Sequence, residues 1–569
     1  MSEEGKQMSN RLHEAAFVRP VLAFAIAIAL VALAPTSPVR SARGVVSSFP
    51  FSNKVASTPF ESGGYPVPSG SRVPLAGTCA LGPYNANHSE SWIAVNPGTE
   101  DLVGSSKFFF DKYSTFYMFH LGSYRILKGL PVDDNLIPGY ECISTGTQAM
   151  PPSWTNTTDP NVDFDTQGRV YQTMLAFNAF WDASPLHPDG AISMSFSDDM
   201  GQTWVRGNGG LDLEQSPNAS ARQAGDVEDK QWVVVNHISG SSFRDHVYAV
   251  WSVFDAKATK VRMAVSRDRG VTFDKAVTIS PPSQVGPAVT FVLPQIDAAG
   301  SVYVAFVSFP PNGAGSTIYV ARSDDDAQTF TPFVPVTTVN MIPTPGLPNT
   351  RFRDGITESF AASPTYPGHL YLAYEEWSGT KMDVKFTQST DGGLTWSKPV
   401  VVNDNVDSLG VPTDQFQPTV ASGSGGAVAV AFYDRRQACP NDPSVLSADV
   451  GRSNFCIDTS LQAFKDGGAG AVRVGGNVRI SQFTWDPEQP GQHVDGLSQY
   501  PCAGARDPCP VGRGFIGDYF GLAVSATNIY ALFVSTHYPS SVTAEEGGPV
   551  YYQQQVLATV PRSAVGLEP

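Results

Sequence analysis

The sequence predicts an all-β protein built from one repeated unit, and three observations carry this prediction. A short phrase recurs four times, roughly 55–70 residues apart. Short apolar runs that end at turn residues recur between the copies. The 569 residues include 52 glycines and 45 prolines but only 16% charged residues, which suits many strands and turns. A repeat at a nearly fixed spacing indicates an array of one structural unit.

The phrase reads S-x-D-x-G-x-T-W/F and is typical of a tight hairpin turn. Short Ser and Asp side chains hydrogen-bond to nearby backbone N–H groups, and glycine supplies a backbone angle that a Cβ resists. The closing aromatic residue restarts a strand. In the third copy Ala327 replaces glycine, so that turn either carries strain or is altered. The residues with these structural roles are Ser197, Asp199, Gly201, Trp204, Ser266, Asp268, Gly270, Ser323, Asp325, Ser389, Asp391, Gly393 and Trp396.

The phrase resembles the Asp box, or BNR repeat, of the sialidase-like β-propellers. This resemblance implies one propeller of four-stranded antiparallel blades, often closed by strands from both chain ends. A second repeat, of strand starts, extends the count from four units to seven. Sialidases with the box usually have six blades, so six is the alternative count. The strand starts are Glu90–Val95, Asn161–Phe164, Asp229–Val235, Leu293–Ile296, Glu358–Ala362, Gln415–Val420 and Asp518–Ala523.

The N-terminal part predicts an exported protein. Arg11 and Arg19 precede an apolar run, so residues 1–34 are expected to be a signal peptide or an N-terminal anchor. Residues 35–75 are rich in Ser, Pro and Gly and are expected to be a linker, with the propeller occupying 76–569. The protein is then secreted or at the cell surface, and membrane contact is expected only through the anchor.

Cysteine usage agrees with an oxidising compartment. Two pairs bracket expected insertions near 439–456 and 502–509, and two cysteines remain. No Cys/His cluster has zinc spacing. No cofactor is required, although carboxylates at strand starts allow a structural calcium ion. The proposed disulfides are Cys439–Cys456, Cys502–Cys509 and Cys79–Cys142.

The net charge of −16 argues against nucleic acid as a partner, because phosphate binding requires a basic face. In the sialidase-like family the box lies on outer turns, away from the active site. We therefore expect a functional site at the strand starts, where Glu90, Asp229, Glu358 and Asp518 stand at similar positions of the repeat. They predict a partial acidic ring at one channel mouth. Alternatively, they hydrogen-bond to backbone N–H groups where inner strands begin.

A second candidate site follows the apolar strand that ends at Phe432. Arg435 and Arg436 stand beside Asp434, and paired guanidinium groups can bind an anionic substrate through two parallel hydrogen bonds. Alternatively, Asp434 and one arginine form a structural ion pair that orders the loop from Cys439 to Cys456.

The resemblance to sialidases also implies a catalytic set. Members use three arginines to hold the substrate carboxylate, a Tyr nucleophile assisted by a Glu, and an Asp acid/base. Arg125, in Tyr124-Arg125-Ile126-Leu127, is the nearest match to the first arginine, with Leu where the family has Pro. The other matching residues are Arg353, Arg435 and Arg436 as arginines, Tyr519 as nucleophile, Glu375 or Glu358 as its helper, and Asp434 or Asp518 as acid/base.

Two functions of different classes remain open. The first is an exported exo-glycosidase that cleaves terminal sialic acid or a similar anionic sugar. The second is a non-catalytic propeller that binds a glycan or a protein at its channel face, since one fold hosts both kinds of activity.

Overall fold

A computed structural model describes the compact unit Phe49–Pro569. The described residues are 49–57, 87–109, 119–136, 156–177, 190–215, 227–254, 258–309, 315–343, 346–350, 352–355, 358–404, 407, 409–488, 515–543 and 547–568. Cys79, Cys142, Cys502 and Cys509 lie outside them, so their two proposed disulfides stay predictions. The expected signal segment 1–34 also lies outside them.

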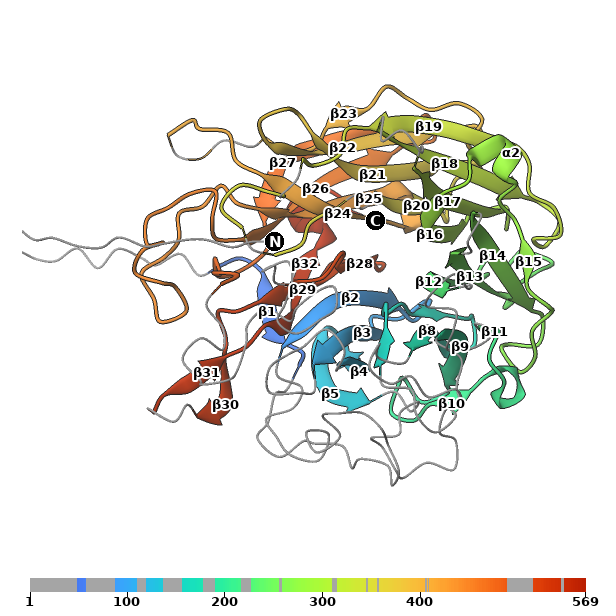
Figure 1. The fold of residues 1–569 in the computed structure, drawn as a ribbon, viewed down its shortest axis with the longest axis horizontal. Coiled ribbons are helices and arrows are strands. Elements are labelled where there is room, and N and C mark those ends of the chain that lie inside the picture. The colour runs from blue at the N-terminus through green and yellow to red at the C-terminus, as the bar shows by residue number, and fades with distance from the viewer. Residues whose placement is uncertain are drawn as a thin grey trace, which may run out of the picture. The chain divides into compact units, whose positions relative to one another are not determined.

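The described residues form seven antiparallel sheets that are arranged as blades around a central channel (Figure 1). Blade 1 contains β2 (His88–Val95), β3 (Leu102–Phe109), β4 (Phe119–Leu127) and β5 (Leu130–Leu136). Blade 2 contains β6 (Asn156–Thr158), β7 (Asp163–Phe164), β8 (Val170–Phe177), β9 (Gly190–Ser197), β10 (Val205–Arg206) and β11 (Glu214–Gln215). Blade 3 contains β12 (Val227–Val235), β13 (Val247–Phe254), β14 (Thr259–Ser266) and β15 (Val277–Thr278).

The remaining four blades repeat this order from the inside outward. Blade 4 contains β16 (Val289–Ile296), β17 (Val302–Ser308), β18 (Ser316–Ser323) and β19 (Phe333–Val339). Blade 5 contains β20 (Glu358–Ala362), β21 (Leu370–Trp377), β22 (Met382–Ser389) and β23 (Val400–Val401). Blade 6 contains β24 (Gln415–Gly423), β25 (Ala427–Asp434), β26 (Asp458–Asp466) and β27 (Ala471–Arg479). Blade 7 contains β28 (Gly521–Val524), β29 (Asn528–Ser535), β32 (Gln554–Pro561) and β1 (Ser52–Val55).

The seven predicted units are therefore confirmed, and the six-bladed alternative is wrong. Outside the blades, β30 (Pro539–Thr543) and β31 (Pro549–Tyr551) form a small hairpin. Helical turns are short, and none in the described part of the chain has the length and apolarity to cross a membrane. They are η2 (Asn208–Gly210), α2 (Pro282–Val285), η3 (Ser424–Gly426) and η4 (Arg562–Val565).

Strands from both ends of the chain close the ring. β1 runs antiparallel to β32, with Ser52 opposite Thr559 and Val55 opposite Val556. These residues lie inside the stretch 35–75 that its composition predicts to be a linker, so part of that stretch is the outer strand of blade 7. Joining the two ends in one sheet ties the first and last blades together without leaving a gap in the ring.

The inner strands surround the channel and define its two ends. β2, β7, β12, β16, β20, β24 and β28 contact one another in order, and β28 returns to β2. Because every blade repeats the same strand order, all inner strands begin at one end of the channel, which we call the mouth. Each third strand is antiparallel to the second and ends at the opposite end, so the turns after β9, β14, β18 and β22 lie away from the mouth.

The four repeated turns share one hydrogen-bond pattern. In blade 2 the Ser197 Oγ accepts from Gly201 N at 2.8 Å, and Asp199 accepts from Thr203 N at 2.8 Å and Thr203 Oγ1 at 2.5 Å. Ala327 keeps this pattern, because its N–H donates to Ser323 Oγ at 3.0 Å. Its φ of 61° lies in the left-handed region, so this turn is unaltered and its alanine carries strain.

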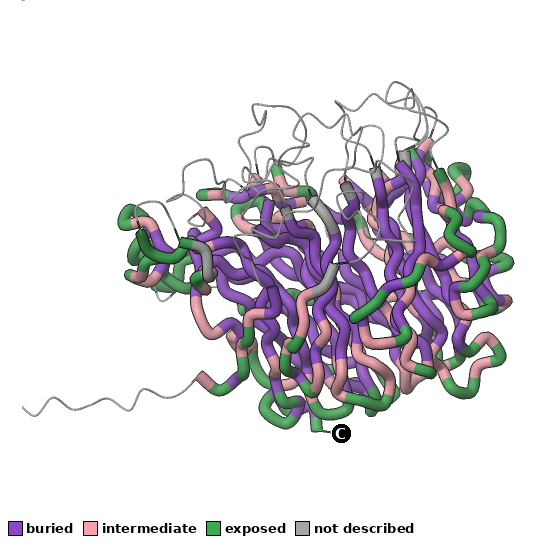
Figure 2. The backbone as a smooth tube through the Cα atoms, turned by 90° about the horizontal axis from the view of Figure 1, so that it is seen from below, coloured by how far each residue is buried: buried purple, intermediate pink, exposed green. Residues whose placement is uncertain are grey.

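Buried tyrosines connect neighbouring blades near these turns. Tyr248 of β13 donates to Asp326 of the blade 4 turn at 2.6 Å, and Tyr371 of β21 donates to Asp466 of blade 6 at 2.6 Å. Alternate strand residues fill the apolar space between blades, and Trp251 is fully buried there. Burial is concentrated in the strands and exposure in the connecting turns (Figure 2).

Candidate functional site

Inner strands are irregular where they reach the mouth. Non-glycine residues take positive φ there in five blades, and the pairing register shifts at this point in β2, β12, β16 and β24. Such bulges re-aim side chains and are frequent beside functional sites. The five residues are Glu90 (φ 41°), Asp159 (60°), Lys230 (51°), Phe291 (56°) and Gln417 (45°).

Oppositely charged side chains meet at the mouth and form what we call the mouth cluster. Lys107 Nζ lies 3.0 Å from Glu90 Oε2, and both side chains are almost completely buried. Lys230 Nζ lies 3.0 Å from Asp518 Oδ2 and 3.7 Å from Asp159 Oδ2. The full cluster is Glu90, Lys107, Asp159, Asp229, Lys230, Arg353, Asp354, Glu358 and Asp518.

Asp518 is the most strongly held carboxylate of the mouth cluster. Arg353 donates its Nε to Asp518 Oδ1 at 3.0 Å and a second guanidinium N–H to Oδ2, so the pair is bidentate. Burial alone would raise the pKa of Asp518, but the charges of Arg353, Lys230 and Lys107 outweigh it and hold that pKa below its usual value. Asp518 is therefore ionised at neutral pH.

Glu358 has the opposite environment. It begins β20, is 5% exposed, and lines a small cavity of about 30 Å³ together with Lys230 and Trp232. Neither of its carboxyl oxygens has a hydrogen-bond partner from another of the described residues. Burial raises the pKa of Glu358 well above its usual value, against a smaller lowering effect of Lys230. Burial therefore favours the neutral, protonated form of Glu358.

Asp354 is a second neutral carboxyl at the mouth. Burial, with Asp414 and Asp518 nearby, raises its pKa to about 8, although Gln417 donates to Oδ1 at 3.3 Å. The Gln417 amide also donates to Gly517 O at 2.8 Å, and the Gln417 backbone N–H donates to Glu375 Oε2 at 2.7 Å. This glutamine therefore connects blade 5, blade 6 and the segment before β28.

Three aromatic rings form the floor of the mouth. The Trp92 and Trp232 ring centroids are 4.7 Å apart, and the Tyr519 ring lies 5.1 Å from Trp232. The Tyr519 hydroxyl donates to Pro160 O at 3.1 Å. Burial, together with the charges of Glu90, Asp159 and other carboxylates, raises the pKa of Tyr519 well above its usual value. The Tyr519 hydroxyl therefore keeps its proton, and the Tyr519 ring forms part of the aromatic floor.

The backbone beside Tyr519 packs tightly against blade 1. Gly517 has φ 112°, and a Cβ at this position would lie 2.5 Å from Glu90 N. Only glycine allows this approach, which brings Asp518 beside the bulge of β2.

Beyond the aromatic floor the channel widens toward its opposite end. A cavity of about 960 Å³ lies there, and Trp92 and Trp232 border both it and the small cavity at the mouth. Strand residues such as Val233, Ala361 and Leu522 make its wall largely apolar. The indole rings therefore separate a charged mouth from an apolar channel.

The structure brings seven of the sequence-predicted site residues together. Asp518, Tyr519 and Arg353 belong to the mouth, and Glu375 reaches it through Gln417. Glu90, Asp229, Glu358 and Asp518, predicted to form an acidic ring, also lie there, but among lysine and arginine side chains.

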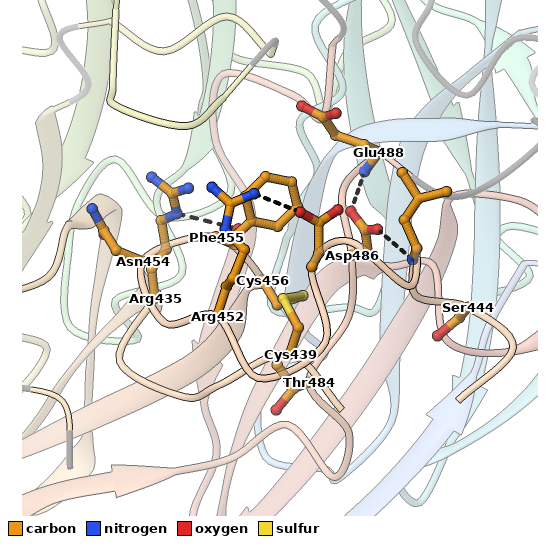
Figure 3. The surroundings of a disulfide bond; sticks show 12 residues. Arg435, Cys439, Ser444, Arg452, Asn454, Phe455, Cys456, Thr484, Asp486 and Glu488 are labelled. Carbon is orange, nitrogen blue, oxygen red and sulfur yellow. Dashed lines mark hydrogen bonds and ion pairs between the residues drawn. A yellow bond between two sulfur atoms is a disulfide. The ribbon is translucent and has the colours of Figure 1, made fainter. Parts of the chain in front are cut away.

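The arginines of blade 6 lie elsewhere, around the disulfide-bracketed loop. Arg435 is fully buried and donates to Phe455 O at 3.3 Å (Figure 3). It also donates to Pro348 O at 2.7 Å and to Asp414 Oδ2 at 3.2 Å. Arg436 donates to Asp434 Oδ2 at 2.6 Å. The structural ion pair considered for Asp434 is thus present.

Two further predictions concern the same loop and blade 1. The Cys439–Cys456 disulfide is confirmed (Figure 3). Arg125 lies on β4, the third strand of blade 1, and donates its Nε to Asp133 Oδ2 at 2.6 Å. It therefore takes part in an ion pair of the outer strands and not in the mouth.

Lys107, Lys230 and Asp159 belong to the mouth cluster but were not among the predicted site residues. Lys230 directly follows the predicted Asp229, and the bulge of β12 is what makes it the partner of Asp518. The sequence does show polar residues at the start of β12. Which of them faces Asp518 depends on the bulge, and the bulge is set by the fold. Within the described residues, His, Cys, Asp and Glu side chains do not gather in groups of three or more that could hold a metal ion.

Comparisons with known proteins find similarity in fold. No family model and no curated protein matches the sequence. A protein of unknown function from Dyadobacter fermentans matches at 12% identity and TM-score 0.42, over 63% of this chain and 93% of its own. An intramolecular trans-sialidase from Ruminococcus gnavus matches at 13% and 0.39, over 85% and 96%.

An alpha-L-arabinanase from Penicillium chrysogenum matches at 14% identity and TM-score 0.37, over 72% of this chain and 94% of its own. The fold predicted from the repeated phrase is confirmed by the blades themselves. The chain is a seven-bladed β-propeller with sialidases and arabinanases among its structural neighbours.

Proposed function

We propose that this protein is a glycoside hydrolase that acts at the mouth, with Asp518 as the ionised carboxylate and Glu358 as the protonated one. One observation carries the proposal: Arg353 and Lys230 both pair with Asp518 and favour its ionised form, whereas Glu358 has no such pair and burial favours its protonated form. Pairs of carboxyl groups divided in this way perform acid and base roles in glycoside hydrolysis.

The roles follow from the two environments. Glu358 donates a proton to the oxygen of the leaving group, because burial favours its protonated form. Asp518 accepts a proton from water or stabilises positive charge on the sugar ring, because Arg353 and Lys230 keep it ionised. The rings of Trp92, Trp232 and Tyr519 offer apolar faces against which the C–H face of a sugar packs.

A panel of aryl glycosides, including an α-sialoside and an α-L-arabinofuranoside, tests this proposal with the purified full chain. Turnover is expected, and Asp518→Asn or Glu358→Gln should lower kcat by about 10²–10⁴-fold. Asp434→Asn is the matched control, because it makes the same Asp-to-Asn change at a buried carboxylate that lies in the blade 6 ion pair. Wild-type rates in both mouth variants would refute the assignment.

A sialidase-type reaction is the second candidate, because Tyr519 and Arg353 do share the mouth. It requires release from the sialoside and its loss in Tyr519→Phe. The predicted non-catalytic propeller corresponds to glycan binding without turnover of any substrate in the panel.

Export is part of the proposal. The Cys439–Cys456 disulfide supports an oxidising compartment, because disulfides persist there. The apolar run near the N-terminus is the expected export signal. Recovery of the chain from the medium or cell surface, with the N-terminus read by mass spectrometry, tests secretion against anchoring.

A further inference from the structure

The mouth contains more carboxyl groups than cations. Among the described residues it has three cationic side chains, Lys107, Lys230 and Arg353, and six carboxyl groups. The carboxyl groups are Glu90, Asp159, Asp229, Asp354, Glu358 and Asp518. With Asp354 and Glu358 in their protonated forms, four carboxylates still face the three cations, so a ligand that enters this site meets more carboxylates than cations.

Each cation is also already engaged by a carboxylate of the protein. Lys107 pairs with Glu90 at 3.0 Å and is 4% exposed. Lys230 pairs with Asp518 at 3.0 Å and with Asp159 at 3.7 Å. Arg353 uses two N–H groups on Asp518, which is the bidentate geometry that a substrate carboxylate would need. An anionic sugar would have to displace an internal carboxylate.

Resting on the glycosidase function proposed above, we infer that the mouth takes an uncharged sugar and discriminates against sugars that carry a carboxylate. Hydroxyl groups of a neutral sugar donate to the oxygens of the ionised carboxylates, which accept hydrogen bonds and have no proton to donate. Aromatic rings at the floor bind the apolar face of the same sugar and require no charge. A sugar carboxylate adds negative charge where each cation already pairs with a carboxylate of the protein.

Matched sugar pairs test this inference with the full chain. Binding is measured on an array in which each neutral oligosaccharide is paired with its uronic acid form, so that only CH2OH and carboxylate differ. We expect the neutral members to bind about tenfold or more tightly, and the preference to shrink as salt is added, because salt screens charge.

A charge variant separates electrostatics from shape. Asp229→Asn removes one carboxylate from the mouth. It should reduce the difference in affinity between the neutral and the acidic member of a sugar pair. Asp324 is an exposed residue of the blade 4 turn, so Asp324→Asn should leave this difference in affinity unchanged. Preference for the acidic members overturns the inference and leaves the glycosidase proposal standing. Absence of both binding and turnover for every sugar removes the glycosidase proposal and the inference with it.

Discussion

Lys230 Nζ lies 3.0 Å from Asp518 Oδ2, although 288 residues separate the two in the chain. Lys230 belongs to blade 3 and Asp518 precedes the inner strand of blade 7, so this contact crosses the mouth. The 5.1 Å approach of Trp232 and Tyr519 repeats the crossing with aromatic rings. The two blades thus close the channel at this level and give the mouth a floor.

Replacing Lys230 with Gln should change the pH dependence of activity. Lys230 helps to hold the pKa of Asp518 below its usual value, so its loss raises that pKa. The acidic limb of the kcat profile then moves to higher pH, because Asp518 becomes protonated earlier as pH falls. Lys381→Gln is the control, since Lys381 pairs with Asp383 at 2.9 Å. Unchanged acidic limbs in both variants would show that Lys230 does not set the charge of Asp518.

Asp354 should make the fold less stable as pH rises. Its folded-state pKa of about 8 exceeds the unfolded value, so its contribution is fully present below pH ~4 and is lost as pH rises toward 8. Asp354→Asn keeps an acceptor for Gln417 but cannot ionise. As pH rises in this range, the free energy of unfolding of the variant should increase relative to that of the wild type by up to about 1.4 kcal/mol per pH unit.

Urea unfolding of both proteins between pH 5 and about 8 measures this difference. The difference between the two should be smallest at pH 5 and should grow toward about pH 8. A constant difference at every pH would mean that Asp354 remains ionised in the folded state.

The Cys439–Cys456 disulfide should stabilise blade 6. It closes a loop across a separation of 17 residues, and constraint of the unfolded chain over such a loop contributes about 3 kcal/mol. Cys439→Ser/Cys456→Ser should therefore unfold at lower urea concentration. The same variant should still cleave substrate at the mouth, because Arg435 and its loop lie outside the mouth cluster. Equal stability of variant and oxidised wild type would contradict this account.

The repeated phrase was sufficient to predict the fold class, because its turn chemistry is local. Ser197 and Asp199 hydrogen-bond within a few residues of themselves, so the sequence alone reveals the hairpin. The closing strand β1 could not be recognised in the same way, since Ser52–Val55 is half-exposed and pairs with β32 at the far end of the chain. Only the second repeat, of strand starts, indicated that more than four blades exist.

The site was predictable only in part, for a different reason. Polar residues at strand starts pointed to the mouth, and Asp518 and Tyr519 lie there. Bulges, however, decide which neighbour faces a partner, and Lys230 pairs with Asp518 because of the register shift between Asp229 and Trp232. The Arg435-Arg436 pair looked equally suitable in sequence, but the packing of blade 6 directs it to its own loop.

Gly201→Ala tests whether the repeated turns require glycine for its backbone angle or for space. An alanine Cβ would meet Ser123 Oγ, Trp204 and Val103 at an ordinary 3.6 Å, so no clash is expected. The φ of 83° is nevertheless left-handed, which costs an L-residue about 1–2 kcal/mol. We expect thermal unfolding to show a loss of about 1 kcal/mol in Gly201→Ala. Unchanged activity at the mouth should accompany it, because the turn lies at the other end of the blade. A loss much larger than this would indicate that space, and not the angle, excludes a side chain, and Ala327 would then require a different explanation.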